Sequence, residues 1–147
     1  MIKFRFIIIV ACFIFSSNSC DKEILADDEL TLEKELYTGE QLRIDGYYYL
    51  KDKNNTLIST YFFYENGILL YGGGRPYPEG LSEIENKIFT SKQWIDKIGS
   101  QKLSWGVFQI DNNKIYFEKW YPSSGGPTPA YIRSGEILND TTFVITK

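Results

Sequence analysis

The sequence predicts a mainly β fold, in which about seven antiparallel strands form an up-and-down meander or barrel with one helical insertion at about residues 82–98. Two observations predict the strands: runs rich in aromatic and β-branched residues recur along the chain, and turns that contain asparagine separate them. A third observation, a set of isoleucines at helical spacing, predicts the insertion. We therefore expect a single β-rich domain over residues 42–147.

The first 19 residues have the pattern of a secretory signal peptide. Lys3 and Arg5 precede the apolar run 6–15, and small or polar residues follow it. This order is typical of a signal peptide, and the run is shorter than the roughly 20 residues that a transmembrane helix needs. Cleavage before Cys20 would leave a chain of the size of one domain.

The stretch that spans the expected cleavage site, residues 17–20 (SNSC), resembles the lipobox of bacterial lipoproteins. Ser19 matches the small residue that lipoboxes carry before the cysteine, whereas Ser17 stands where most of them have an aliphatic residue. The other cysteine, Cys12, lies in the segment to be removed, so Cys20 would have no disulfide partner within the mature chain. The resemblance implies that Cys20 is lipidated and anchors the protein stably to a membrane.

Residues 21–41 are rich in acidic side chains and predict a solvated tether between the lipidated Cys20 and the domain. The cluster Asp21-Lys22-Glu23 is similar to surface-export signals of lipoproteins in some Gram-negative lineages. In enterobacterial sorting, by contrast, an aspartate directly after the cysteine implies retention at the inner membrane. We expect a location in the cell envelope, with the outer membrane or cell surface favoured over the inner membrane.

Strand signals dominate from Leu42 onward. The Asn66-Gly67 pair between two apolar runs is the strongest hairpin signal, because a type I′ turn needs positive φ at both central residues. Further turns are expected near Asn112 and Asn139. The predicted strand runs are 42–52, 56–64, 68–72, 104–110, 114–121, 130–138 and 141–147.

The predicted helix over 82–98 has its own boundary signals. Ser82 and Glu85 have the spacing of a capping box at the start, and Gly99 suits the C-terminal end. A break near residues 90–91 would divide the helix into two short pieces.

The order of turns and loops suggests a barrel with two different ends. In a meander the chain changes ends at every strand, so the tight turns near Asn66, Asn112 and Asn139 would share one end. The long loops 72–80 and 122–130 would share the other, unless the helix crosses the barrel and reverses the order. A closed end opposite a loop-rich end resembles the lipocalin-like (calycin) barrels, which bind small molecules at an open mouth. Since the tether would enter the first strand from the closed end, the open end is expected to point away from the membrane.

The residue types exclude several classes of chemistry. The chain has no histidine, which removes Ser-His-Asp and Cys-His arrangements and the usual zinc sites. The triple glycine 72–74 is not followed by the Lys-Ser or Lys-Thr pair of a phosphate-binding loop, and we expect a flexible strand exit there. Without its signal peptide the chain keeps 14 basic and 19 acidic residues, which argues against a nucleic-acid partner. No cofactor and no metal site are indicated.

Glu118 is the best candidate for catalytic chemistry. It lies two residues before Trp120, so the two side chains would share one face of a strand. Together with a second acid, Glu118 could serve in a glycoside hydrolase. We favour the simpler interpretation, an exposed acid beside a half-buried tryptophan.

The aromatic runs are the main signal for binding. The runs 47–49, 61–64 and 120–121 lie on predicted strands, and neighbouring side chains on a strand point to opposite faces. Aromatic rings on the outer face would be covered by the helix 82–98, covered by a partner, or exposed for binding. The candidate ligand-binding residues at the open end are Tyr77, Trp120, Tyr121 and Tyr131.

The sequence leads to three hypotheses for function. The first is a binding module for a small apolar or sugar-like ligand at the open end. The second is a structural or protein-interaction lipoprotein with no small-molecule site, which would expose an apolar patch. The third is a carboxylate-based hydrolase, which needs two acids about 5–9 Å apart in one cleft. We favour the first and expect a protein that is not an enzyme. Its expected partners are the membrane, through lipidated Cys20, and a small ligand or a protein.

Overall fold

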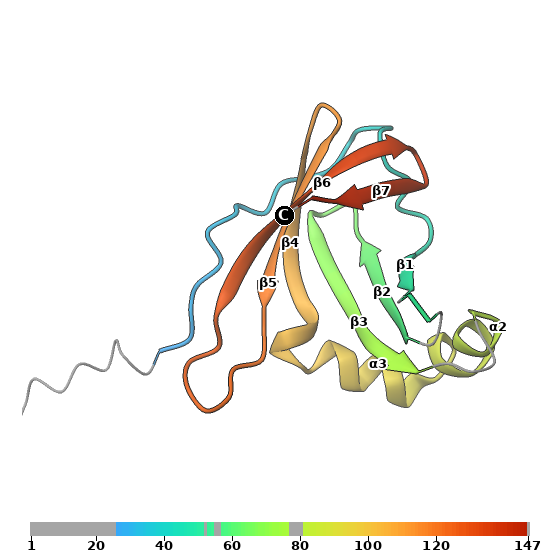
Figure 1. Ribbon diagram of the computed structural model, residues 1–147, viewed down its shortest axis with the longest axis vertical. Helices are drawn as coiled ribbons and strands as arrows, with labels where there is room; N and C mark the ends of the chain where they lie inside the picture. The colour runs from blue at the N-terminus through green and yellow to red at the C-terminus, as the bar shows by residue number, and fades with distance from the viewer. Residues whose placement is uncertain (1–25, 52, 55–56, 77–80, 147) are drawn as a thin grey trace, which may run out of the picture.

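Seven antiparallel strands form a nearly closed barrel in the computed structural model, which describes residues 26–51, 53–54, 57–76 and 81–146 (Figure 1). The strands pair in chain order, each with the next, as the sequence predicts. The fold is compatible with a lipocalin-like barrel. The expected signal peptide, Cys20 and Tyr77 lie outside the described residues. The strands are β1 (Tyr48–Lys51), β2 (Leu57–Phe63), β3 (Ile68–Pro76), β4 (Trp105–Asp111), β5 (Lys114–Trp120), β6 (Ala130–Asn139) and β7 (Thr142–Ile145).

The insertion between β3 and β4 is a pair of short helical segments. The first consists of α2 (Leu81–Glu83) and a π-helical stretch (Ile84–Phe89), and the second is α3 (Lys92–Gly99), followed by a 3-10 turn (Lys102–Ser104). The expected break at residues 90–91 is confirmed. β3 and β4 pair antiparallel, so the insertion returns to the end of the barrel that it left. No helix in the described part of the chain is long and apolar enough to cross a membrane.

The helix boundaries differ from those expected. Ser91 caps α3, because its hydroxyl oxygen accepts a hydrogen bond from the Trp94 N–H (3.4 Å). At the first segment the helix already begins at Leu81, before the expected capping residue. Glu85 accepts a hydrogen bond from the Tyr47 hydroxyl (2.7 Å) and thereby ties the π-helical stretch to the start of β1.

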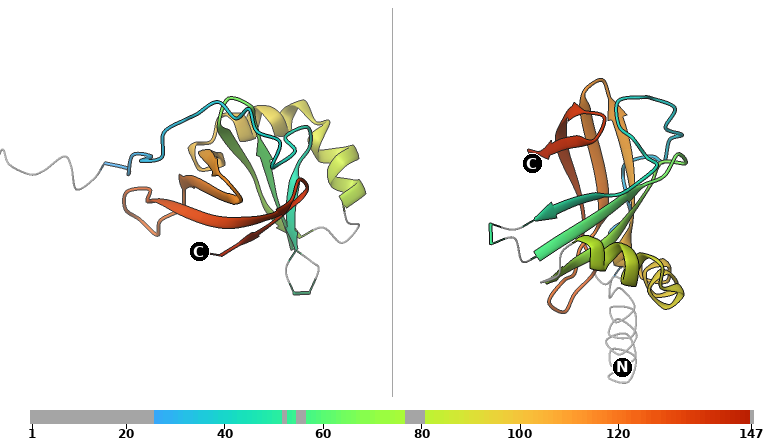
Figure 2. Two further views of the ribbon diagram at one scale, coloured as in Figure 1. Left: turned by 90° about the horizontal axis from the view of Figure 1, so that it is seen from above. Right: turned by 90° about the vertical axis from the view of Figure 1, so that its right-hand side faces the viewer.

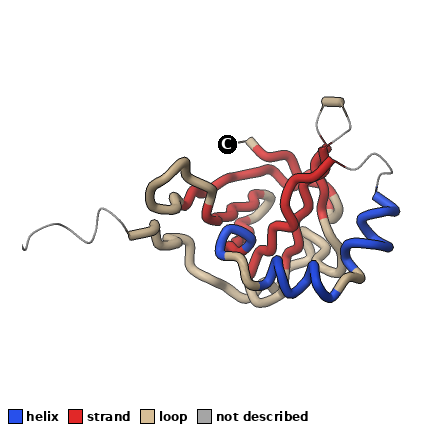
Figure 3. Tube along the Cα trace, turned by 90° about the horizontal axis from the view of Figure 1, so that it is seen from below, coloured by secondary structure: helices blue, strands red, loops and turns tan. Residues whose placement is uncertain are grey.

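The helical insertion lies along one side of the barrel (Figure 3). There it covers outward-facing aromatic residues of β2 and of the segment just before β1. The ring of Phe62 packs edge-on against Phe89 at a centroid distance of 4.9 Å and lies 6.3 Å from Trp94. Tyr47, just before β1, lies 4.8 Å from the Phe89 ring. This confirms the expectation that the helix covers aromatics of the outer face, and it explains how one sheet can carry rings on both sides.

The triple glycine is part of β3, which continues to Pro76, so the expected strand exit at 72–74 is wrong. Gly72 faces the helices. A Cβ there would overlap the Thr60 hydroxyl and lie 3.3 Å from the Trp94 ring. The glycine therefore lets α3 approach the sheet closely.

The closed end of the barrel is filled by a hydrophobic core. The strand turns at Asn66, Asn112 and Asn139 lie at this end, as the meander predicts. Leu42 is also buried in this core, whereas the sequence placed it at the start of a strand. The other fully buried core residues are Phe63, Leu69, Phe108, Ile115 and Phe117.

Residues 26–44, which we call the N-terminal strap, run along the outside of the barrel before the chain enters β1 (Figures 1 and 2). The strap starts at the open end, where the Asp28 N–H donates a hydrogen bond to the carbonyl oxygen of Thr128 (3.1 Å). It reaches the closed end at Tyr37, whose N–H donates to the carbonyl oxygen of Glu65 (2.7 Å). The strap therefore passes from one end of the barrel to the other.

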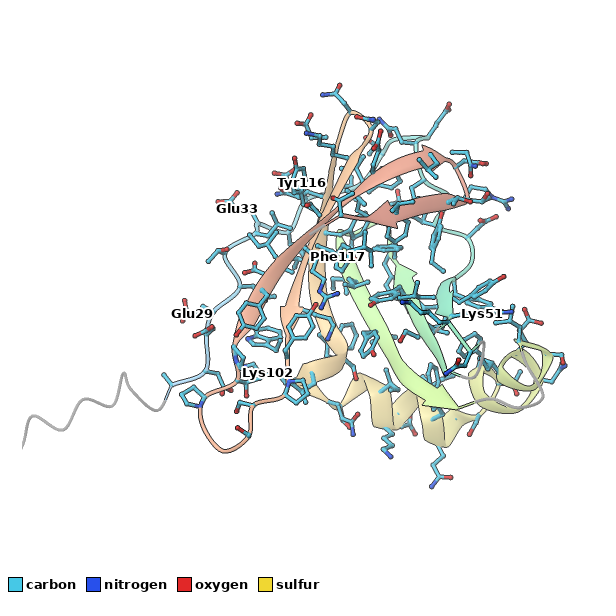
Figure 4. All side chains as sticks on the ribbon, in the orientation of Figure 1. Glu29, Glu33, Lys51, Lys102, Tyr116 and Phe117 are labelled. Carbon is cyan, nitrogen blue, oxygen red and sulfur yellow. The ribbon has the colours of Figure 1, made fainter. Side chains whose placement is uncertain are left out.

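The course of the strap changes two expectations. The acidic segment was expected to be a solvated tether, yet its described part is hydrogen-bonded to the barrel, with Glu29 and Glu33 on the outer, solvent-facing side (Figure 4). The chain does enter β1 from the closed end. Because the strap itself begins at the open end, however, the expectation that this end points away from the membrane loses its basis.

Candidate functional site

The register of the strands decides which side chains line the inside of the barrel. Residues directly opposite each other in an antiparallel pair share a face. On β5 the buried core residues Ile115 and Phe117 point inward, so Lys119, two positions further on, also points inward. On β6 the partners of Phe117 and Lys119 are Arg133 and Tyr131. The inner wall near the open end thus carries two cations on neighbouring strands.

Lys119 is enclosed by aromatic rings and is only 4% exposed. Its Nζ lies 3.9 Å from the ring centroid of Tyr121 and 4.3 Å from that of Tyr71. It donates a hydrogen bond to the backbone carbonyl of Trp120 (3.2 Å). Among the described residues, no carboxylate forms a hydrogen bond or ion pair with it.

Gly106 on β4 makes room for this lysine. It lies directly opposite Lys119 on the inner face. A Cβ at Gly106 would lie 2.8 Å from the Lys119 Cβ and would overlap the carbonyl oxygen of Glu118. A side chain at this position would therefore force β4 and β5 apart.

Arg133 and Lys119 both lie against the ring of Tyr121. Its guanidinium carbon lies 5.3 Å from the Tyr121 ring centroid. Burial, and then repulsion by Arg133, lower the pKa of Lys119 to about 8, so the lysine still carries its charge at pH 7. Burial raises the pKa of Tyr121 and raises that of Tyr61 to about 12. Both phenols are therefore neutral at pH 7 and can donate hydrogen bonds.

A cleft opens between the edge strands β1 and β7, which do not pair with each other. Near the closed end it is bridged by side chains: the Tyr48 and Phe143 rings lie 5.4 Å apart, and the Tyr48 hydroxyl donates to the carbonyl oxygen of Asp140 (2.8 Å). The cleft has a volume of about 620 Å³. Arg133 is the only charged side chain among the described residues that line it. The lining also includes Tyr47, Tyr48, Tyr49, Leu50, Tyr61, Phe143, Val144 and Ile145.

The cleft adjoins the two cations, of which only Arg133 lines it. Arg133 and Tyr61 line the cleft, and the Tyr61 ring lies 5.2 Å from the Tyr71 ring, over which Lys119 is placed. A ligand in the cleft would thus meet aromatic rings on β1 and β2 and a positive charge on β6.

Of the candidate residues chosen from the sequence, the structure brings two together. The Tyr121 and Tyr131 rings lie 5.6 Å apart at the open end of the barrel. Trp120 does not join them, because it points to the outer face, where its Nε1–H donates to the carbonyl oxygen of Asp28 (2.7 Å) and Lys102 lies 4.6 Å above its ring. Tyr77 lies outside the described residues.

Glu118 has a structural role that the sequence did not reveal. It is only 2% exposed, so the expected exposed acid is wrong. Its carboxylate accepts hydrogen bonds from the N–H groups of Thr31 and Leu32 (both 2.7 Å) and from the Thr31 hydroxyl (3.1 Å). The acid therefore holds the N-terminal strap against β5.

Neither a metal site among the described residues nor a similarity to known proteins indicates a function. Within the described ranges, no three acidic, cysteine or histidine side chains are grouped closely enough to hold a metal ion. Comparison with protein-family models, with curated proteins and with solved structures finds no match to the chain. The function must therefore be argued from the geometry of the barrel.

Proposed function

We propose that the protein is a lipid-anchored envelope protein that binds a small apolar ligand in the cleft between β1 and β7. The observation that carries this proposal is the cleft itself, whose volume of about 620 Å³ lies within the range of about 300–1,000 Å³ that is usual for ligand pockets. Its lining is mostly aromatic and aliphatic. Burial of an apolar ligand against these side chains would remove apolar surface of both from water, which drives binding.

The chemistry of the lining favours an apolar ligand over a sugar. The described lining offers hydroxyl groups of tyrosine and threonine, but it contains no carboxylate and no side-chain amide. Sugars have many hydroxyl groups that lose water on binding, and each must find a new hydrogen-bond partner. Because the described lining supplies no carboxylate or amide for such bonds, we propose an apolar body for the ligand.

The cleft predicts saturable binding of phenylnaphthylamine, a neutral apolar dye whose fluorescence rises in an apolar environment. Leu50→Trp adds a large ring from β1 and is expected to reduce this binding by about tenfold, because part of the cleft is filled. Ile132→Trp is the matched control, since Ile132 is exposed on β6 but does not line the cleft. Absence of saturable binding, or equal binding by the two variants, would contradict the proposed site.

The membrane anchor rests on the lipobox-like residues 17–20 and on Cys20. We expect metabolic incorporation of a palmitate analogue into the wild-type protein and its loss in Cys20→Ala. Cys12→Ala is the control, because this residue lies within the expected signal peptide. Equal labelling of wild type and Cys20→Ala would refute lipidation at this cysteine.

A protein-interaction role is the second candidate, and one observation favours it. Ile132 and Leu138 on β6 and Val144 on β7 are large apolar residues that remain about half exposed. Val144 also lines the cleft, whereas Ile132 and Leu138 lie outside it. Should the dye fail to bind in the cleft, this surface becomes the better supported site.

A further inference from the structure

The two cations at the inner wall, Lys119 and Arg133, have no acidic partner among the described residues. Lys119 is more than nine-tenths buried, and its hydrogen bond goes to a backbone carbonyl. Burial of an ion is unfavourable unless an opposite charge or strong hydrogen bonds compensate it. Contacts with the rings of Tyr71 and Tyr121 offset part of this cost. They do not explain why Arg133, a second cation, lies beside the same tyrosine.

Two like charges around one ring repel each other, and the described residues supply no acid between them. The repulsion also appears in the pKa of Lys119, which Arg133 lowers in addition to the effect of burial. An anion placed between the two groups would reverse this effect. Among the described residues, the inner wall thus carries an unfavourable charge arrangement that a negatively charged ligand would relieve.

We infer that the cleft between β1 and β7 takes a small amphiphilic anion, with its apolar body between the edge strands and one carboxylate, sulfonate or phosphate group against Arg133 and near Lys119. This inference rests on the proposed function, because it specifies the ligand of the same cleft. It extends that function by assigning the polar group of the ligand and the two residues that recognise it.

The chemistry of both side chains suits this role. Arg133 is exposed and lines the cleft, so its planar guanidinium can offer two parallel N–H donors to an anionic group. Lys119 lies deeper, and a charge in a medium of low dielectric acts more strongly than one at the surface. Tyr61 adds a neutral hydroxyl donor on the adjoining wall of the cleft.

Two dyes that share one apolar body test this assignment. Anilinonaphthalene sulfonate has the ring system of phenylnaphthylamine and one added sulfonate group. At neutral pH the wild-type protein is expected to bind the sulfonate about tenfold more tightly than the neutral dye. Arg133→Gln should remove this preference, so that the two dyes bind with similar affinity. Lys119→Met, like Arg133→Gln, should weaken binding of the sulfonate.

The matched control is Lys114→Gln. It removes an exposed cation from β5, the strand of Lys119, at the closed end of the barrel. It should change neither affinity. Arg133→Gln alters an exposed side chain and is expected to fold even if Lys119→Met does not. A decanoate ion should displace the bound sulfonate better than decanol, because only the former carries a charge.

The outcomes separate this inference from the proposed function. Binding of the neutral dye with no preference for the sulfonate, or a preference that survives Arg133→Gln, overturns the anion assignment and leaves the apolar cleft intact. Failure of the neutral dye to bind contradicts the apolar function instead. Tight, Arg133-dependent binding of the sulfonate supports the anion site in either case.

Discussion

Replacement of Phe117 by alanine is expected to lower the free energy of unfolding by about 3–5 kcal/mol. Phe117 is fully buried on the inner face of β5, and its ring lies 5.9 Å from Tyr61 and 6.5 Å from Phe143 (Figure 4). The substitution removes apolar contacts and leaves a cavity that the surrounding strands cannot fill by small movements. Chemical denaturation followed by tryptophan fluorescence measures the change.

The neighbouring Tyr116 provides the control for this prediction. It lies on the same strand but points to the outer face, where it is half-buried (Figure 4). Tyr116→Ala is expected to cost about 1 kcal/mol. Equal losses for the two variants would show that the inner face of β5 does not form the core.

Replacement of Glu118 by glutamine is expected to lower the free energy of unfolding by about 1.5–3 kcal/mol. The carboxylate accepts hydrogen bonds from three donors of the N-terminal strap, two N–H groups and the hydroxyl of Thr31. A glutamine would place its own NH₂ donor against one of these donors and would lose the charge that strengthens the other bonds. The change removes no buried volume, so the loss reports on the hydrogen bonds.

Limited proteolysis gives a second measurement for the same variant. With its contact to β5 weakened, the strap is expected to be cleaved faster in Glu118→Gln than in the wild type. Glu136→Gln is the control, because Glu136 is exposed on β6 and, among the described residues, its side chain accepts a hydrogen bond only from the Asn113 side chain (3.4 Å). Its stability should stay within about 0.5 kcal/mol of the wild type. A strap that is cleaved at the same rate in all three proteins would contradict this role for Glu118.

Local patterns account for the parts of the fold that the sequence predicted. The strand runs and the turn at Asn66-Gly67 depend on side chains and dihedral angles of adjacent residues. The hairpin forms where the pair predicts it, but only Gly67 has positive φ, so the turn is not of the expected type I′. The helix break at residues 90–91 is also local, since Ser91 caps the second piece. The course of the strap is not local. Thr31 and Glu118 are 87 positions apart, and no periodicity connects them.

The candidate site was predictable in part. Tyr121 and Tyr131 are expected near the open end and their rings lie together there, but neither residue lines the cleft. Lys119 was overlooked, although the alternation of β5 carries the signal, since Ile115, Phe117 and Lys119 occupy every second position. The cleft could not be predicted, because it depends on how far β7 stops short of pairing with β1.

The starting point of the N-terminal strap sets a limit on how far the barrel could move from an anchor. Ala26, the first described residue, lies two positions before Asp28, which is bonded to the rim of the open end. Five residues separate it from Cys20, and the six steps of chain between the two would span only about 20 Å even when fully extended. If Cys20 is lipidated, this short segment would hold the rim of the open end close to the bilayer. An amphiphile could then pass between the lipid and the cleft over a short distance through water.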